Sequence, residues 1–127
     1  MSAGTQEALR VLIVDDDEQN ADAMQQYLAF HSHRAESAGS AEEALLKIDG
    51  MGEPGGGSSD YQVIIIDLNL PGMRGEELAQ RLRRRYANQL RLIGISGDHG
   101  VPGVVGPFDV RLPKPCPPRI LLQNLQP

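Results

Sequence analysis

Short apolar runs alternate with segments of helical period along this chain. Residues 10–14 (RVLIV) are apolar and β-branched and end abruptly in three aspartates, which is typical of a buried strand with carboxylates at its end. From 18 to 31 the apolar residues instead recur three or four positions apart, as they do on one face of a helix. The same alternation continues along the chain. It predicts strands over 10–14, 34–37, 61–66, 90–95 and 110–112, and helices over 18–31, 40–48, 75–86 and 118–125.

This order of elements predicts an α/β fold with one five-stranded parallel sheet. Because crossovers between parallel strands are right-handed, we expect helices on both faces of the sheet, in a three-layer sandwich. One helix is missing from the alternation. Residues 97–108 contain four glycines and two prolines, which prevent a regular helix of useful length. We therefore expect the fourth helix to be degenerate or replaced by a loop.

The composition is that of an ordinary globular protein. A chain of 127 residues, 40% of them apolar and 23% charged, fits one domain over residues 1–127 with a single core. No apolar run approaches the ~18 residues of a membrane span, and the first ten residues lack the apolar stretch of a signal peptide. Cys116 is the only cysteine, which excludes an internal disulfide and a cysteine-only metal cluster. We expect a cytoplasmic protein that does not contact membranes directly.

The formal net charge of −5 argues against direct binding to nucleic acids, which usually requires a basic face. Four arginines nevertheless fall in one predicted helix, and we interpret them as a solvated helix face and not as a polyanion site: Arg81, Arg83, Arg84 and Arg85. The three histidines are interpreted as surface residues and not as ligands: His31, His33 and His99. The glycine-rich stretch 50–60 is interpreted as a surface loop, because the halves on either side are too small to fold alone.

Five chemically active residues stand at the predicted carboxyl ends of four strands: Asp15, Asp16, Asp67, Ser96 and Lys114. The carboxyl ends of parallel strands meet at one edge of a sheet, which is where α/β folds bind ligands. Three carboxylates brought together repel one another, and a hard divalent cation removes that conflict. Carboxylate oxygens and water are the ligands that Mg²⁺ prefers, and Mn²⁺ could take its place.

The lysine and the serine add a positive charge and a hydroxyl at the same edge. Such a site suits phosphoryl transfer, in which the metal and the lysine neutralise phosphoryl oxygens while a carboxylate attacks in line. A simpler explanation is that acids at strand ends only cap the following helix, as we expect of Asp17 or Glu18. Two acidic strand ends, together with a serine and a lysine at two others, are harder to explain in that way.

Two acidic segments, VLIVDDD at 11–17 and DLNLPGMRG at 67–75, resemble motifs of the receiver domains of two-component signalling, and the resemblance extends over nearly the whole chain. VLIVDDD, at 11–17, is similar to the first strand and acidic pair of that family, with Asp15 and Asp16 as the pair. DLNLPGMRG, at 67–75, is similar to its phosphoacceptor motif, with Asp67 as the acceptor.

Two further segments complete the resemblance. ISG, at 95–97, places Ser96 where the family has a threonine or serine that hydrogen-bonds the phosphoryl group. LPKP, at 112–115, places Lys114 at the lysine of the family, followed by a proline whose peptide bond is often cis. Each of the five hallmark positions therefore carries a residue of the expected type. The sequence of residues 108–125 is similar to the corresponding segment of receivers attached to hybrid histidine kinases.

The resemblance implies a flavodoxin-like (βα)5 fold and a signalling function. Asp67 would take a phosphoryl group from a histidine kinase or a histidine phosphotransfer protein. Mg²⁺ would be held by Asp16, Asp67 and the main-chain carbonyl of Asn69, with Asp15 acting largely through water. No enzyme activity is implied beyond the self-catalysed phosphorylation and dephosphorylation of the acceptor, in which Ser96 and Lys114 take part.

The sequence departs from the family in three places, of which one is a loop after the second helix, at 50–60, that is longer than usual. It also leaves two alternatives. Arg111 stands three residues before the lysine, where the family usually has Tyr, Phe or His, and the segment between Ser96 and Lys114 is shorter than usual. One alternative is a pseudo-receiver, a binding module that works without phosphorylation, although the complete five-residue site favours phosphorylation. The other is a haloacid-dehalogenase-like phosphohydrolase, which needs a second aspartate where Asn69 stands.

Overall fold

The computed structural model describes residues 8–50, 61–97 and 106–126. These ranges form one sheet of five parallel strands: β1 (Arg10–Val14), β2 (Arg34–Ala38), β3 (Val63–Asp67), β4 (Arg91–Ser96) and β5 (Val110–Pro113). The strands lie in the order β2-β1-β3-β4-β5. The prediction of a five-stranded parallel α/β fold is therefore confirmed.

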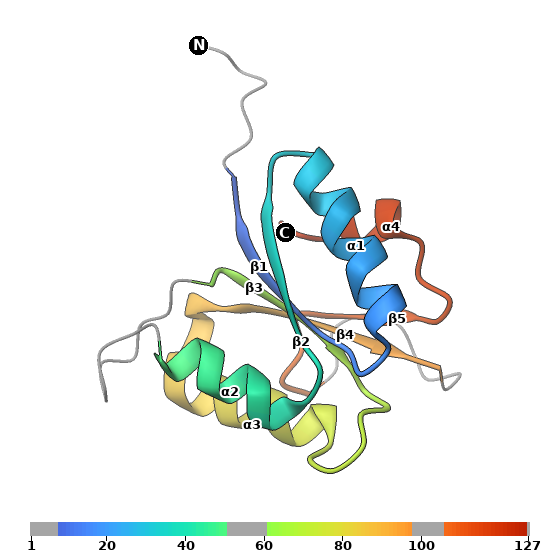
Figure 1. Ribbon diagram of the computed structural model, residues 1–127. Helices are drawn as coiled ribbons and strands as arrows, with labels where there is room; N and C mark the ends of the chain where they lie inside the picture. The colour runs from blue at the N-terminus through green and yellow to red at the C-terminus, as the bar shows by residue number, and fades with distance from the viewer. Residues whose placement is uncertain (1–7, 51–60, 98–105, 127) are drawn as a thin grey trace.

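Helices cover both faces of this sheet, as Figure 1 shows. They are α1 (Glu18–Phe30), α2 (Ala41–Gly50), α3 (Gly75–Tyr86) and α4 (Pro118–Gln123), with a short 3-10 helix, η1 (Ala87–Gln89), after α3. Apolar residues of α1 and α4 share one core with the sheet, and those of α2 and α3 share the other. None of the helices in the described ranges is long and apolar enough to cross a membrane.

The central strands are apolar along their whole length because both of their faces are covered. Ile13 of β1 lies beside Ile65 of β3, which lies beside Ile93 of β4. These side chains belong to the core under α1 and α4, and their neighbours Ile64 and Leu92 belong to the core under α2 and α3. This register brings the carboxyl ends of β1, β3, β4 and β5 to one edge of the sheet.

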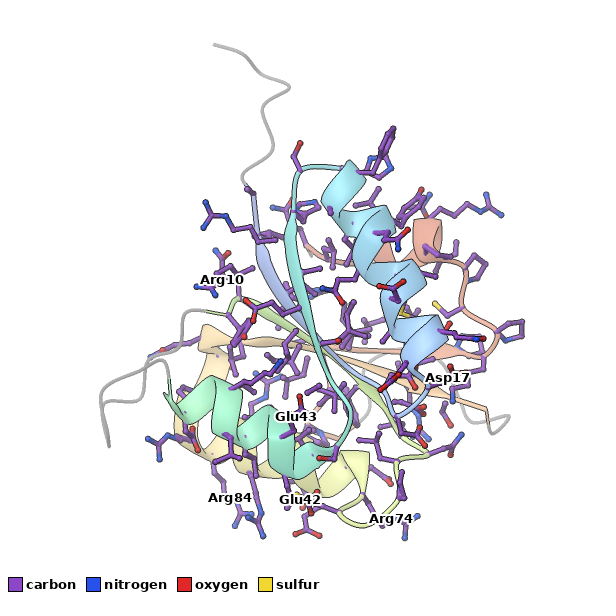
Figure 2. The ribbon with its side chains drawn as sticks, in the orientation of Figure 1. Arg10, Asp17, Glu42, Glu43, Arg74 and Arg84 are labelled. Carbon is purple, nitrogen blue, oxygen red and sulfur yellow. The ribbon has the colours of Figure 1, made fainter. Side chains whose placement is uncertain are left out.

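The first helix begins at a capped residue immediately after the acidic end of β1. The side chain of Asp17 accepts the backbone N–H groups of Gln19 and Asn20 at 3.1 and 3.2 Å, which confirms the cap expected at Asp17 or Glu18. Figure 2 shows Asp17 at this end of α1, beside the strand ends. The cap fixes the direction in which the chain leaves β1, and so the orientation of the acids before it.

Most of the segment 97–108 and nearly all of 50–60 lie outside the described residues, so the expectation of a degenerate fourth helix stays a prediction. The described part turns at Gly106, with φ at 59°, and then buries Phe108. A Cβ built on Gly94 would lie 3.1 Å from the Phe108 ring, so the ring packs directly on the backbone of β4. The sequence pattern did not identify Phe108 as a core residue.

His33 is buried, and its assignment to the surface was wrong. Only 7% of it is exposed, and its Nδ1 accepts the backbone N–H of Leu9 at 3.1 Å. The chain doubles back after α1, where the His33 N–H bonds the carbonyl of Leu28, and this turn holds the imidazole against the start of β1. Burial, with a smaller contribution from His31, lowers the pKa of the imidazole below its usual value.

Candidate functional site

A cavity of about 760 Å³ opens at the carboxyl edge of the sheet. The predicted site residues that line it are Asp15, Asp16, Asp67, Asn69 and Lys114. They come from the ends of β1 and β3 and from the segment that follows β5, so that residues 99 positions apart in the sequence meet in one place. Ser96 differs from them, because it is buried at the end of β4 and its side chain does not line the cavity.

The three aspartates form one cluster of oxygen atoms. One carboxylate oxygen from each of Asp15, Asp16 and Asp67 lies within 4.8 Å of the others. Asp15 and Asp67 are 6% and 5% exposed, whereas Asp16 is open to solvent. Hard oxygen donors of high negative charge, partly open to water, are what Mg²⁺ requires, and the cluster therefore fits such an ion.

Burial raises the pKa of the Asp15 carboxyl, and the charge of Asp67 acts in the same direction. The N–H of Asp17, the side chain of Asn20 and the charge of Lys114 act the other way. Asp15 Oδ1 accepts the Asp17 N–H at 2.9 Å, and its Oδ2 accepts from Asn20 Nδ2 at 2.7 Å. These two bonds fix both oxygens of the buried carboxylate.

Asn20 is a residue that the sequence reasoning missed. Its amide holds Asp15 from the first turn of α1, five positions along the chain. The available signal was its position, because a polar residue at the start of the helix after an acidic strand end must face that end or the solvent. The pattern of apolar residues does not tell whether the Asn20 side chain faces the strand end or the solvent.

Lys114 supplies the positive charge of the cavity. Its Nζ lies 2.9 Å from Asp67 Oδ1, which also accepts the backbone N–H of Asn69 at 2.9 Å. The backbone N–H of Lys114 bonds the carbonyl of Ser96 at 2.8 Å, which anchors this residue to the end of β4. The Lys114–Pro115 peptide bond is cis, as the family resemblance implies.

Gly75, the last residue of DLNLPGMRG, allows α3 to start close to β3. A Cβ at this position would lie 2.9 Å from the carbonyl oxygen of Asp67, and equally close to side-chain carbons of Ile66 and Leu68. Real Cβ atoms do not approach other atoms so closely, so any side chain at this position would force the backbone of Asp67 or the start of α3 to move. The glycine therefore sets the position of the β3 end that carries Asp67.

Three of the four arginines of α3 are exposed, as expected of a solvated helix face, whereas Arg83 is partly buried and that interpretation was wrong for it. Arg81 pairs with Glu77 at 3.1 Å, and Arg85 Nε lies 3.3 Å from Asp49 of α2. Arg83 pairs with Asp109 at 2.9 Å and also donates to main-chain carbonyls of residues 87, 90 and 107. Arg84, which is exposed, has no carboxylate partner within the described ranges.

Arg111 occupies the position at which the family resemblance led us to expect Tyr, Phe or His. It is half-buried on β5, beside Gly94 of β4. The ring that packs on Gly94 comes instead from Phe108, just before β5. The aromatic side chain in this part of the sheet is thus supplied three residues earlier in the chain.

Comparison with known proteins agrees with this geometry. The family model of the response regulator receiver domain matches residues 11–125. The sensory/regulatory protein RpfC of Xanthomonas campestris pv. campestris is 33% identical over 84 residues, which is 66% of this chain and 10% of that protein. The chain therefore spans about a tenth of the length of this curated relative.

Solved structures share the fold. A CheY-like receiver domain protein from Methanospirillum hungatei JF-1 superimposes with a TM-score of 0.75 and 27% identity, covering 94% of this chain and 91% of that one. The response regulator TrrA from Thermotoga maritima, solved in complex with Mg²⁺ and BeF, gives a TM-score of 0.59 and 25% identity, covering 72% and 71%. These likenesses confirm the flavodoxin-like arrangement of strands and helices.

Proposed function

Because this chain belongs to the response regulator receiver domain family of two-component signalling, we propose that it accepts a phosphoryl group on Asp67 with the help of Mg²⁺. One observation carries the proposal. The buried carboxylate of Asp67 lies 2.9 Å from Lys114 Nζ, inside the same cluster of oxygens as Asp15 and Asp16. A nucleophile, a cation and a set of metal ligands thus share one cavity.

Each residue of the cavity has a different role in the proposed transfer. An oxygen of Asp67 forms the new bond to phosphorus as the bond from phosphorus to the donor nitrogen breaks, and the electron pair leaves with that nitrogen, which takes up a proton. The Lys114 ammonium, already beside Oδ1, pairs with a phosphoryl oxygen. The hydroxyl of Ser96, buried next to the cavity, would donate to another phosphoryl oxygen after a small shift of the β4 end. Hydrolysis returns the Asp67 carboxylate and releases inorganic phosphate.

Mg²⁺ would be held by the side chains of Asp15, Asp16 and Asp67 and by the main-chain carbonyl of Asn69, with Asp15 acting largely through water. When bound, the ion neutralises phosphoryl oxygens as charge develops on them. The chain holds its own part of the site in place before binding, because Asn20 and the Asp17 N–H orient Asp15. Receiver domains act with histidine kinases or phosphotransfer proteins, and we propose such a protein as the donor here.

The first test is the intact mass of the protein after incubation with acetyl phosphate and Mg²⁺. We expect one added phosphate in the wild type and none in Asp67→Asn. Asp22→Asn is the matched control, because Asp22 is an exposed aspartate of α1 that bonds only Gln26 among the described residues. An adduct that persists in Asp67→Asn would contradict the assignment of the acceptor. An unmodified wild type would favour the alternative of a binding module that works without phosphorylation.

The second test concerns the metal. Mg²⁺ should raise the melting temperature of the wild type, since an ion that binds only the folded state stabilises it. Asp16→Asn should lose most of that increase and still fold, because Asp16 is exposed and makes no contact on which the core depends. An equal increase in Asp16→Asn and in the Asp22→Asn control would place the ligands elsewhere.

A further inference from the structure

The outer side of α2 and α3 carries an exposed leucine beside an apolar groove. Leu46 of α2 is 75% exposed, and the only other large apolar side chain so exposed among the described residues is Phe30, at 84%. The groove measures about 590 Å³, and Leu46 lines it together with Leu45 and Met73. Most of its exposed surface is apolar, although the charged side chains of Glu42, Asp49 and Arg81 also line it.

Charges of opposite sign flank this groove, on different helices. α2 carries three carboxylates and one lysine, whereas α3 carries four arginines and two glutamates. Most of these charges are paired within the chain, but Glu42 of α2 and Arg84 of α3 have no ion-pair partner within the described ranges. Figure 2 shows both side chains reaching outward from this helix layer, away from the sheet.

We propose that this face binds a second copy of the same chain, with α2 of each copy against α3 of the other. A two-fold interface requires a surface that is complementary to itself. This face meets the requirement, because it has a protruding leucine beside a hollow, and an acidic helix beside a basic one. A partner whose surface is uniformly acidic or uniformly basic would instead be repelled by one of the two helices, which carries charge of the same sign.

The dimer would leave the phosphorylation cavity open. The cavity is lined by residues of the strand ends, of α1 and of the segment before α4, whereas α2 and α3 cover the opposite face of the sheet. Self-association is therefore independent of the function proposed above. The apolar centre is small, and interfaces of this kind are weak and transient, so the dimer forms at high protein concentration.

The test is sedimentation equilibrium of the full chain, without Mg²⁺ or phosphodonor, up to about 1 mM. We expect concentration-dependent dimerisation that weakens as salt is raised, because exposed charges are screened. Leu46→Glu should weaken association about tenfold or more, since a central apolar contact is lost and a charge is buried. Phe30→Glu, the same change on the distant end of α1, should leave it within about twofold. A wild type that stays monomeric throughout would overturn the proposal and leave the groove to a different protein.

A charge reversal tests which helices meet. Glu42→Arg and Arg84→Glu should each weaken association about threefold or more, because each places like charges opposite one another across the interface. The double variant again carries opposite charges on the two helices and should recover to within about twofold of the wild type. Equal effects of Leu46→Glu and Phe30→Glu, or a double variant as weak as the single ones, would show that α2 and α3 do not meet in this way.

Discussion

Gly75→Ala tests how far the position of Asp67, the proposed acceptor at the end of β3, depends on the start of α3. The added Cβ would stand 2.9 Å from three atoms, of which the Asp67 carbonyl oxygen belongs to the backbone and cannot rotate away. Ordinary contacts begin at about 3.4 Å, so the helix start or the Asp67 backbone must move by about 0.5 Å. Overpacking of this kind costs about 1–3 kcal/mol, against which alanine regains up to about 1 kcal/mol through its higher helix propensity.

We therefore expect a net loss of about 1–2 kcal/mol in the free energy of unfolding. The assay is urea denaturation, in which the midpoint falls while the slope stays the same. Gly39→Ala is the matched control, since a Cβ there would meet only Glu43 Oε1 at 3.7 Å. Acetyl phosphate labelling of Gly75→Ala should also slow, because the displaced backbone carries Asp67, the proposed acceptor. If Gly75→Ala is as stable as Gly39→Ala and labels at the wild-type rate, the close approach does not position Asp67.

Two further predictions concern groups away from the cavity. Arg83→Ala should cost about 2 kcal/mol of stability in the same assay, because it removes the donor to the Pro107 carbonyl and the ion-pair partner of the half-buried Asp109, which keeps only its bond from the Leu92 N–H. The exposed Arg84→Ala should change stability by less than about 0.5 kcal/mol, and equal losses in the two variants would refute this role of Arg83. Burial lowers the pKa of His33 in the folded protein, so as the pH falls the imidazole takes up a proton in the unfolded chain first. The contribution of neutral His33 to stability is therefore fully present above about pH 6.5 and should decline as the pH falls below that value. His33→Asn keeps an acceptor for the Leu9 N–H and should flatten this decline. The check is the urea midpoint measured from about pH 5 to about pH 7.5. A variant whose midpoint falls with pH as steeply as that of the wild type would assign the decline to other groups.

The sequence by itself determined the order of the elements and the edge at which the chemistry lies. Apolar runs such as 10–14 and 61–66 end in acid, and right-handed connections between parallel strands leave those ends no other edge to occupy. The expectation that Asp15, Asp16, Asp67 and Lys114 would meet followed from this topology, and the structure brings all four to one cavity. Neither step required knowledge of side-chain conformations.

Only the tertiary structure decided which atoms meet. The 2.9 Å contact of Lys114 with Asp67, the bond from Asn20 to Asp15 and the recess of Ser96 from the cavity depend on the packing of whole elements. The burial of His33 depends on a turn that folds back onto β1, a contact between segments that no local pattern contains. A periodic pattern gives the face on which a side chain lies, whereas distances at that face are set by close packing between elements distant in the sequence.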